Sequence, residues 1–269
     1  MRSDMGLDMS SDSSAVSLKN VEFCWQPGQP VLNIPELTID HRERLFVRGP
    51  SGSGKTTLLG LLGGVLTPTS GQIEVLGQEI GHLEQAQRDQ FRAQHIGFIF
   101  QMFNLIPYLT VVENVTLPLS FAPKRLQKIQ AKDSTAEQEA LRLLAHLGLS
   151  DPHLLQRKVT GLSIGQQQRV AAARALIGSP ELIIADEPTS ALDTDTREAF
   201  IELLFAECKA ANSTLIFVSH DPHLEHLFDR SFALHIINQA SAQYQHSHHD
   251  SAKHTTVQEN SEETLTTQP

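Results

Sequence analysis

The segment with the clearest chemical potential is a glycine-rich stretch that ends in a lysine and two threonines. It has the spacing G-x-x-x-x-G-K-T. Its glycines let the backbone curl so that successive N–H groups point at phosphate oxygens, and the start of a following helix adds partial positive charge. Lys55 can reach β- and γ-phosphates, and the Thr56 hydroxyl is placed to bind Mg²⁺. The predicted phosphate-binding residues are Gly49, Pro50, Ser51, Gly52, Ser53, Gly54, Lys55, Thr56 and Thr57.

The sequence on either side of this loop supports that interpretation. An apolar run, Leu45-Phe46-Val47, precedes the loop, and the helical pattern Leu58-Leu59-Gly60-Leu61-Leu62 follows it. The motif requires this order of strand, loop and helix. The alternative, a glycine-rich turn that contains a lysine by chance, is disfavoured by these flanking elements.

Two further apolar runs end in side chains that could act on a bound nucleotide. The run 182–185 ends at Asp186 and Glu187, and the run 214–219 ends at His220. Carboxylates at the end of a buried strand are costly unless they bind something. Asp186 suits the Mg²⁺ shell and Glu187 could polarise a water molecule. His220 lies at the carboxyl end of its strand, where α/β sheets place ligands, although it is one of 13 histidines.

Other candidate residues have two interpretations each. Trp25, the single tryptophan, could stack on an adenine ring or be a core aromatic. Gln101 ends a short apolar strand, and it could be a loop residue or touch Mg²⁺ and the attacking water. Ser163 could simply cap a helix, or its hydroxyl could join the Gly165 N–H in an anion site.

Composition limits the class of protein. The chain has 269 residues with 21 Lys and Arg against 31 Asp and Glu, a formal charge of -10, which disfavours general nucleic-acid binding. Its two cysteines, Cys24 and Cys208, indicate a reducing compartment. No apolar run approaches the roughly 18 residues that span a bilayer, and the N-terminus is not a secretory signal. We expect a cytoplasmic protein, with any membrane-embedded part supplied by another chain.

The order of patterns predicts an α/β fold. Early hairpin-type strands before the phosphate loop indicate an antiparallel β subdomain attached to a parallel-sheet core, and residues 102–170 indicate a helical insertion with a small apolar face of its own. A basic segment at 124–132 is expected to be exposed. Residues 1–15 and 240–269 are expected to be a disordered leader and tail, and the tail histidines His246, His248 and His249 are interpreted as solvated rather than metal-binding. The predicted strands are 16–23, 32–39, 44–48, 72–76, 95–100, 182–187 and 214–220, and the predicted helices are 80–94, 111–119, 135–147, 166–177 and 196–210.

In combination, these pieces resemble the ATP-binding subunit of ABC transporters over about residues 16–237. The resemblance identifies Trp25 as the adenine-stacking aromatic, 49–56 as the Walker A loop and Gln101 as the Q-loop glutamine. Leu162-Ser163-Ile164-Gly165-Gln166 corresponds to the signature, Asp186 and Glu187 to the Walker B pair, Asp193 to the D-loop aspartate and His220 to the switch histidine. Ile164 departs from the glycine usual at that position, while Ser163 and Gly165 are retained.

The resemblance implies a fold, a reaction and partners. It implies a RecA-like P-loop NTPase core and a homodimer that holds two ATP molecules, each between one Walker A loop and the other subunit's signature, which includes Gln166. It further implies that Glu187 activates water, that His220 holds the γ-phosphate, and that a membrane permease on a separate chain keeps the protein at the inner face of the membrane. Residues 96–101, 104–107 and 113–115 are similar to the lipoprotein-release and macrolide-exporter branch. Two rivals are a soluble ABC-type ATPase that acts in assembly or regulation, and a P-loop kinase, which would not explain residues 162–166.

Overall fold

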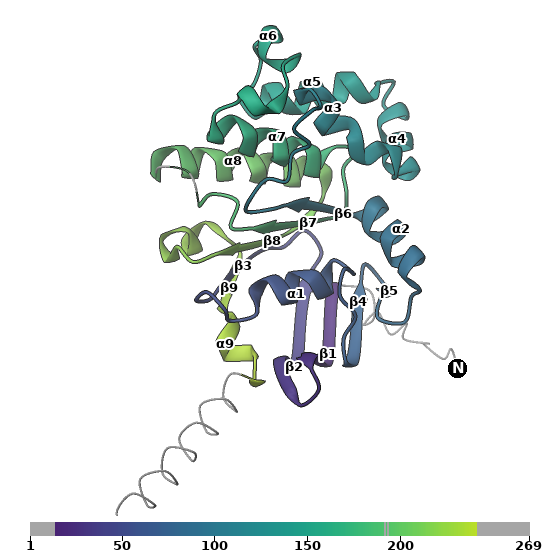
Figure 1. Cartoon of the computed structure of the whole chain (residues 1–269), viewed down its shortest axis with the longest axis vertical. Helices are drawn as coiled ribbons and strands as arrows, with labels where there is room; N and C mark the ends of the chain where they lie inside the picture. Colours follow the sequence, from purple (N-terminus) through teal and green to yellow (C-terminus); the bar gives the residue numbers. More distant parts are fainter. Residues whose placement is uncertain (1–13, 191, 193, 241–269) are drawn as a thin grey trace, which may run out of the picture.

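The computed structural model describes residues 14–240, with the exception of residues 191 and 193. Two β-sheets form the framework of this part of the chain (Figure 1). The antiparallel sheet has the order β2-β1-β4-β5, with β1 at Ser14–Gln26, β2 at Gln29–Asp40, β4 at Ser70–Val75 and β5 at Gln78–Glu79. The parallel sheet has the order β6-β7-β8-β3-β9, with β6 at Ile96–Ile99, β7 at Leu182–Asp186, β8 at Thr214–Ser219, β3 at Arg44–Arg48 and β9 at Arg230–Ala233. The predicted α/β fold with an antiparallel subdomain is confirmed.

Helices cover both faces of the parallel sheet. α1 lies between this sheet and the antiparallel one, α7 and α8 cover the opposite face, and α3 to α6 form the far end of the molecule (Figure 1). The α-helices are α1 Lys55–Leu62, α2 Gln85–His95, α3 Val111–Thr116, α4 Pro123–Gln130, α5 Ala136–His146, α6 Pro152–Leu155, α7 Ile164–Leu176, α8 Thr194–Ala211 and α9 Leu234–Ile237. Short 3₁₀ turns are Leu117–Ser120, Val159–Gly161 and Pro222–Leu227.

The strands of the parallel sheet divide the core into two. Successive side chains of a strand point to opposite faces, so Leu182 and Ile184 pack towards α1 and the antiparallel sheet, while Ile183 and Ala185 pack towards α7 and α8. The core on the side of α7 and α8 also contains Leu143 and other buried side chains of the helical insertion. The apolar face predicted for the insertion therefore packs into the core of the sheet and does not form a core of its own.

Several element boundaries differ from the predicted ones. β1 begins at Ser14, and Ala15 is fully buried, so the first strand starts two residues earlier than predicted. α2 begins at Gln85 rather than at residue 80, because Glu84 and Gln87 form a capping box there. The short helix predicted within 111–119 to stop near Pro118 ends at Thr116, and the chain continues as a 3₁₀ turn that contains Pro118.

The C-terminal boundary and the extent of the insertion also need correction. Ala240, assigned to the tail from sequence, is buried and its N–H donates to the Asn238 side chain. α7 runs without a break through residue 170, where the insertion was expected to end. The strand β9, which the sequence did not indicate, lies at the edge of the parallel sheet beside β3. The histidines of the tail and residues 1–13 lie outside the described residues.

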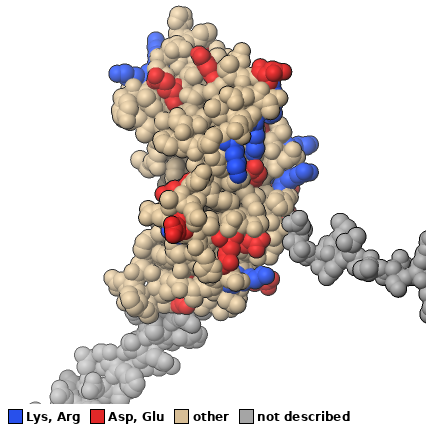
Figure 2. Space-filling view, turned by 90° about the vertical axis from the view of Figure 1, so that its right-hand side faces the viewer, with Lys and Arg blue, Asp and Glu red and all other residues tan. Residues whose placement is uncertain are grey.

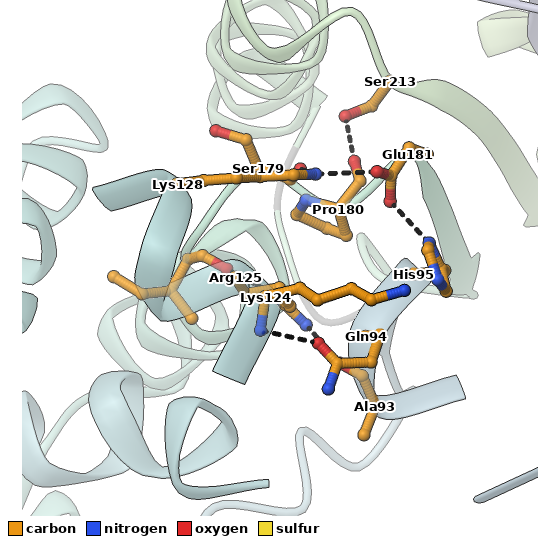
Figure 3. Close-up of polar contacts among 11 residues, drawn as sticks. Ala93, Gln94, His95, Lys124, Arg125, Lys128, Ser179, Pro180, Glu181 and Ser213 are labelled. Carbon is orange, nitrogen blue, oxygen red and sulfur yellow. Dashed lines mark hydrogen bonds and ion pairs between the residues drawn. The ribbon is translucent and has the colours of Figure 1, made fainter. Parts of the chain in front are cut away.

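The basic segment 124–132 is not uniformly exposed. Arg125 on α4 is 2% exposed, and its guanidinium donates to the carbonyls of Ile177 and Ala175 at the end of α7. It also donates to the carbonyl of Ala93 near the end of α2 (Figure 3). Those carbonyls carry the partial negative charge of helix C-termini, so they offset the buried cation although no carboxylate is hydrogen-bonded to it among the described residues. The charge of Glu181 nearby also favours the protonated guanidinium. The expectation of an exposed segment is wrong for Arg125, because a sequence cannot indicate which helix ends will surround it.

Among the described residues, no helix combines the length and the apolar character needed to cross a lipid bilayer. The longest, α8, carries charged residues along its length. Cys24 on β1 and Cys208 on α8 are both free thiols, as the wide separation in sequence predicted. Burial raises the pKa of Cys208 to about 12.

Candidate functional site

The residues at the carboxyl ends of β3, β7 and β8 line a single cavity of about 520 Å³. Parallel strands place these ends at one edge of the sheet, which explains why segments far apart in the sequence meet there. The cavity is lined by Trp25, Val31, Ser51, Gly52, Gly54, Lys55, Thr56, Thr57, Gln101, Asp186, Glu187 and His220. The structure thus brings together the predicted phosphate loop, glutamine, acidic pair and histidine.

The loop between β3 and α1 has the conformation of a phosphate cradle. Gly54 caps α1 with φ 95°, and a Cβ there would lie 2.8 Å from Leu32, so only glycine fits. The buried Ser53 hydroxyl has no hydrogen-bond partner among the described residues. Lys55 Nζ donates to the carbonyl of Gly49 at 2.6 Å. Loop N–H groups, an unpaired hydroxyl and a lysine fit a bound phosphate chain.

Oxygen atoms suited to a divalent cation lie beside this loop. The Thr56 hydroxyl donates to Asp186 Oδ2 at 3.4 Å. Burial, together with the neighbouring Glu187, raises the pKa of Asp186, against the effects of Thr56 and Lys55. Hydroxyl and carboxylate oxygens are the ligands that Mg²⁺ prefers, so these residues fit the metal.

An acid and a histidine are paired at the other side of the cavity. Glu187 Oε2 lies 2.7 Å from His220 Nδ1, and Glu187 Oε1 lies 4.0 Å from Lys55 Nζ. Glu187 adopts φ 48°, and its N–H donates to the carbonyl of Val218 at 2.9 Å. This left-handed conformation turns the carboxylate away from the line of β7 and towards β8. A buried carboxylate held by histidine can accept a proton from water.

Trp25 lies at the mouth of the same cavity. Its side chain is 64% exposed, and its ring packs edge-to-face on Phe23 with centroids 4.9 Å apart. The alternative of a core aromatic is wrong, since the indole is held at the surface. An exposed ring beside a phosphate loop offers a face for stacking a base.

The signature segment lies away from this cavity. Ser163 caps α7, with its hydroxyl accepting from the Gln166 N–H, and the Gln166 side chain accepts from the Ser163 N–H at 2.9 Å. The neighbouring Ile164 is 56% exposed. The cavity beside the phosphate loop is not lined by any residue of this segment, which comprises Ser163, Ile164, Gly165 and Gln166. The predicted D-loop residue Asp193 lies outside the described residues.

Sequence reasoning missed residues that hold the site from a distance. Arg174 on α7 donates to the carbonyls of Phe103 and Asn104, two and three residues after Gln101. Arg197 on α8 binds Asp221, which directly follows His220. These contacts join positions 24 to 71 residues apart. An arginine on a polar helix face gives no sequence signal of such a contact.

A second concavity of about 490 Å³ lies between the sheet edge at β6 and the helical insertion. Phe98, Phe100 and Phe121 form its apolar part, and Arg125 and Arg174 lie at its base. Phe121 is 67% exposed, and Met102 and Tyr108 nearby in sequence are more exposed still. Large apolar side chains gathered at a surface indicate a place where another molecule binds.

Comparison with known proteins identifies the family. Residues 32–190 match the family model described as "ABC transporter". The chain is 41% identical over 204 residues to the lipoprotein-releasing system ATP-binding protein LolD of Psychrobacter arcticus, covering 76% of this chain and 87% of that one. It is 42% identical over 200 residues to LolD of Syntrophotalea carbinolica, covering 74% and 84%.

A solved structure has the same fold. It is a dimeric, post-hydrolysis state of the ATP-binding cassette MJ0796 bound to ADP and Pi, with a TM-score of 0.72 and 35% identity over 84% of this chain and 95% of that one. With the phosphate loop and the oxygen ligands described above, these likenesses show an ATPase that uses ATP and Mg²⁺. The chain belongs to the ABC transporter family and, within it, groups with the ATP-binding proteins of lipoprotein-releasing systems.

Proposed function

We propose that this chain works as a homodimer that binds two ATP molecules and uses their hydrolysis to drive a membrane permease on a separate chain. One observation carries the proposal. The start of α7 presents Ser163 and Gly165 to solvent, outside the cavity that the same chain's phosphate loop lines. A helix start is an anion site, so a second subunit can supply it to the exposed side of the bound phosphates. The dimeric state of the related cassette MJ0796 supports this arrangement.

Within this proposal, each residue of the cavity has a role. Trp25 stacks on adenine, the loop 49–57 surrounds the phosphates, and Lys55 offsets the charge that develops on them. Thr56, Asp186 and Gln101 would hold Mg²⁺, which supplies further positive charge to the phosphates.

Hydrolysis requires a base. Glu187 accepts a proton from the attacking water, and His220, 2.7 Å away, keeps that carboxylate and the γ-phosphate in register. Ser163, Gly165 and Gln166 serve the nucleotide of the other subunit. The role of Asp193 at the same interface stays a prediction.

The permease is proposed to bind at the apolar concavity beside Phe100 and Phe121. Gln101 lines the nucleotide cavity, and the next residues lead into this concavity. Arg174 holds that loop from α7, the helix that begins at the signature. Movement at the nucleotide can therefore reach the partner through one loop and one helix. On the face that α2 and α4 occupy, Lys and Arg are interspersed with Asp and Glu (Figure 2).

The proposed cargo is lipoprotein, since the relatives are components of lipoprotein-releasing systems. The permease would hold the chain at the inner face of the membrane. Purification of the tagged chain from detergent-solubilised membranes tests this part: we expect a membrane permease to co-purify. Recovery with soluble partners only would contradict it and favour the assembly or regulatory role.

Mixing two inactive variants tests the dimeric site. If Ser163 acts on the partner's ATP, a dimer of one Lys55→Ala subunit and one Ser163→Ala subunit has one intact site and one site with both lesions. If Ser163 acts on its own subunit's ATP, both sites carry one lesion. We expect differently tagged mixed dimers to bind one ATP tightly in the closed form, while each parent homodimer stays open. Verified mixed dimers that close no better than the parents would refute the proposal.

A further inference from the structure

Arg197, near the start of α8, bridges two segments that end at the hydrolytic pair. One arm of its guanidinium donates to the carbonyl of Leu192 at 2.9 Å, and the other binds the carboxylate of Asp221. Both partners of the ion pair are largely covered, with side chains 19% and 20% exposed. Arginine suits this position because its planar fork can bind two acceptors at once.

Asp221 is fixed on three sides, and it follows His220 directly. Its N–H donates to the Ser219 hydroxyl at 3.1 Å, and its carboxylate accepts the N–H of His223 at 3.0 Å as well as the bond from Arg197. By contrast, the imidazole of His220 is 67% exposed and is held by Glu187. The position of that ring therefore depends on the backbone that Asp221 anchors.

The Leu192 side of the bridge leads back to Glu187. The N–H of Ser190 donates to the carbonyl of Glu187 at 3.2 Å, and the N–H of Leu192 donates to the carbonyl of Thr189 at 3.2 Å. Two successive turns therefore connect Glu187 to Leu192. Arg197 also lines a cavity of about 220 Å³ together with His220 and Thr189. Its guanidinium thus closes a ring of contacts that contains both Glu187 and His220.

We propose that Arg197 is a positioning residue for ATP hydrolysis, which ties the turn at Leu192 to Asp221 and so holds His220 against Glu187. Leu192 also lies against the start of α7, with its Cδ2 3.5 Å from where a Cβ on Gly165 would lie. The bridge therefore connects the signature of a subunit with the hydrolytic pair of the same subunit. The inference rests on the proposed roles of Glu187 and His220.

Steady-state kinetics of the full-length Arg197→Gln variant test the inference. Arg197 does not line the nucleotide cavity, so we expect KM and the Kd for ATP to stay within about twofold of wild type. We expect kcat to fall roughly ten- to a hundredfold, the range for a catalytic group displaced by about 1 Å. Arg197→Lys, which can keep the charge pair with Asp221 but lacks the fork, should give an intermediate kcat.

Arg44→Gln provides the matched control. Arg44 also forms an arginine–aspartate pair, with Asp229, through a 3.0 Å bond from its Nε, at the opposite end of β3 from the phosphate loop. This pair is more exposed than that of Arg197. We expect this variant to lose stability without losing kcat. A kcat for Arg197→Gln within about twofold of that for Arg44→Gln would overturn the inference. Should Arg197→Gln not fold, Asp221→Asn takes its place, since it removes the charge pair and keeps the oxygen that caps residue 223.

A double-mutant cycle shows whether Arg197 acts through His220. In single-turnover assays on a His220→Ala background, Arg197→Gln should cause no further loss, whereas losses that multiply would overturn the inference. Glu187→Gln, measured alongside, separates this inference from the proposed function. Wild-type turnover in Glu187→Gln would overturn both. Loss of turnover in Glu187→Gln with wild-type turnover in Arg197→Gln would overturn the role of Arg197 alone.

Discussion

Replacing Arg125 with methionine should destabilise the chain, although it removes a buried positive charge. Two effects oppose each other. Burial lowers the pKa of Arg125 to about 10, and the difference from the ordinary arginine value of 12.5 corresponds to a cost of about 3 kcal/mol for keeping the charge buried. Methionine would relieve that cost while retaining much of the apolar stem.

The hydrogen bonds outweigh this relief. Arg125 makes one bond to the Ile177 carbonyl at 2.8 Å, one to the Ala175 carbonyl at 2.9 Å and a second, shorter one to Ile177. Hydrogen bonds to a charged group contribute about 1.5–3 kcal/mol each, and a buried carbonyl left without a donor is costly. The net expectation for Arg125→Met is a loss of roughly 1.5–6 kcal/mol in the free energy of unfolding.

Urea unfolding followed by far-ultraviolet circular dichroism measures this loss. Lys124→Met is the control, because Lys124 precedes Arg125 on α4 and its side chain is exposed. We expect the control to change the free energy of unfolding by no more than about 0.5 kcal/mol. If Arg125→Met were as stable as the control or more stable, the burial cost would exceed the contribution of the carbonyl contacts, and our reasoning would be wrong.

Three further predictions concern the nucleotide site and the pH dependence of stability. Glu187→Gln should keep ATP binding and lower kcat by roughly 10²–10⁴-fold, measured by phosphate release, because it removes the base; near-normal turnover would exclude that role. Trp25 fluorescence should change on adding ATP, and Trp25→Ala should weaken ATP binding by roughly 1–3 kcal/mol, whereas an unaltered spectrum and affinity would exclude stacking. Although burial raises the pKa of Glu181, hydrogen bonds from His95 and Lys128 outweigh it and lower the pKa to about 2 (Figure 3). The contribution of this carboxylate to stability is therefore present above about pH 4.5 and lost as the pH falls towards 2. Wild type should be more stable than Glu181→Gln by up to about 1 kcal/mol at pH 6, given partial exposure, and the difference should vanish in urea titrations near pH 2; a difference independent of pH would contradict this.

Local pattern was sufficient to find the phosphate loop and its strands. β3 begins and ends where predicted, at Arg44 and Arg48, because these two charged residues bound the buried apolar run 45–47. Gly54 was identifiable from the spacing G-x-x-x-x-G-K-T, and its left-handed φ and close approach to Leu32 in the structure explain why glycine is required there. Asp186, Glu187 and His220 were identifiable because each lies at the carboxyl end of a buried strand, Asp186 as its last residue and the other two directly after it.

The family resemblance added what local pattern left open. Residue type alone did not decide between the interpretations of Trp25 and Ser163, and the order of motifs along the chain favoured the nucleotide-binding ones. The structure adds the exposure of Trp25 and the position of Ser163 outside its own chain's phosphate cavity. An exposed indole and a capped helix start cannot be distinguished from core and loop residues by periodicity, since both depend on what packs against them.

Tertiary structure alone decided the contacts made by long charged side chains. Arg125 belongs to a basic helix that the sequence indicates is exposed, yet it is buried against the ends of α7 and α2. Arg197 and Arg174 likewise fix the backbone beside the cavity from other helices. A strand or a glycine turn is specified by a few neighbouring residues, whereas an arginine finds its acceptors among carbonyls and carboxylates that only the folded chain brings within reach.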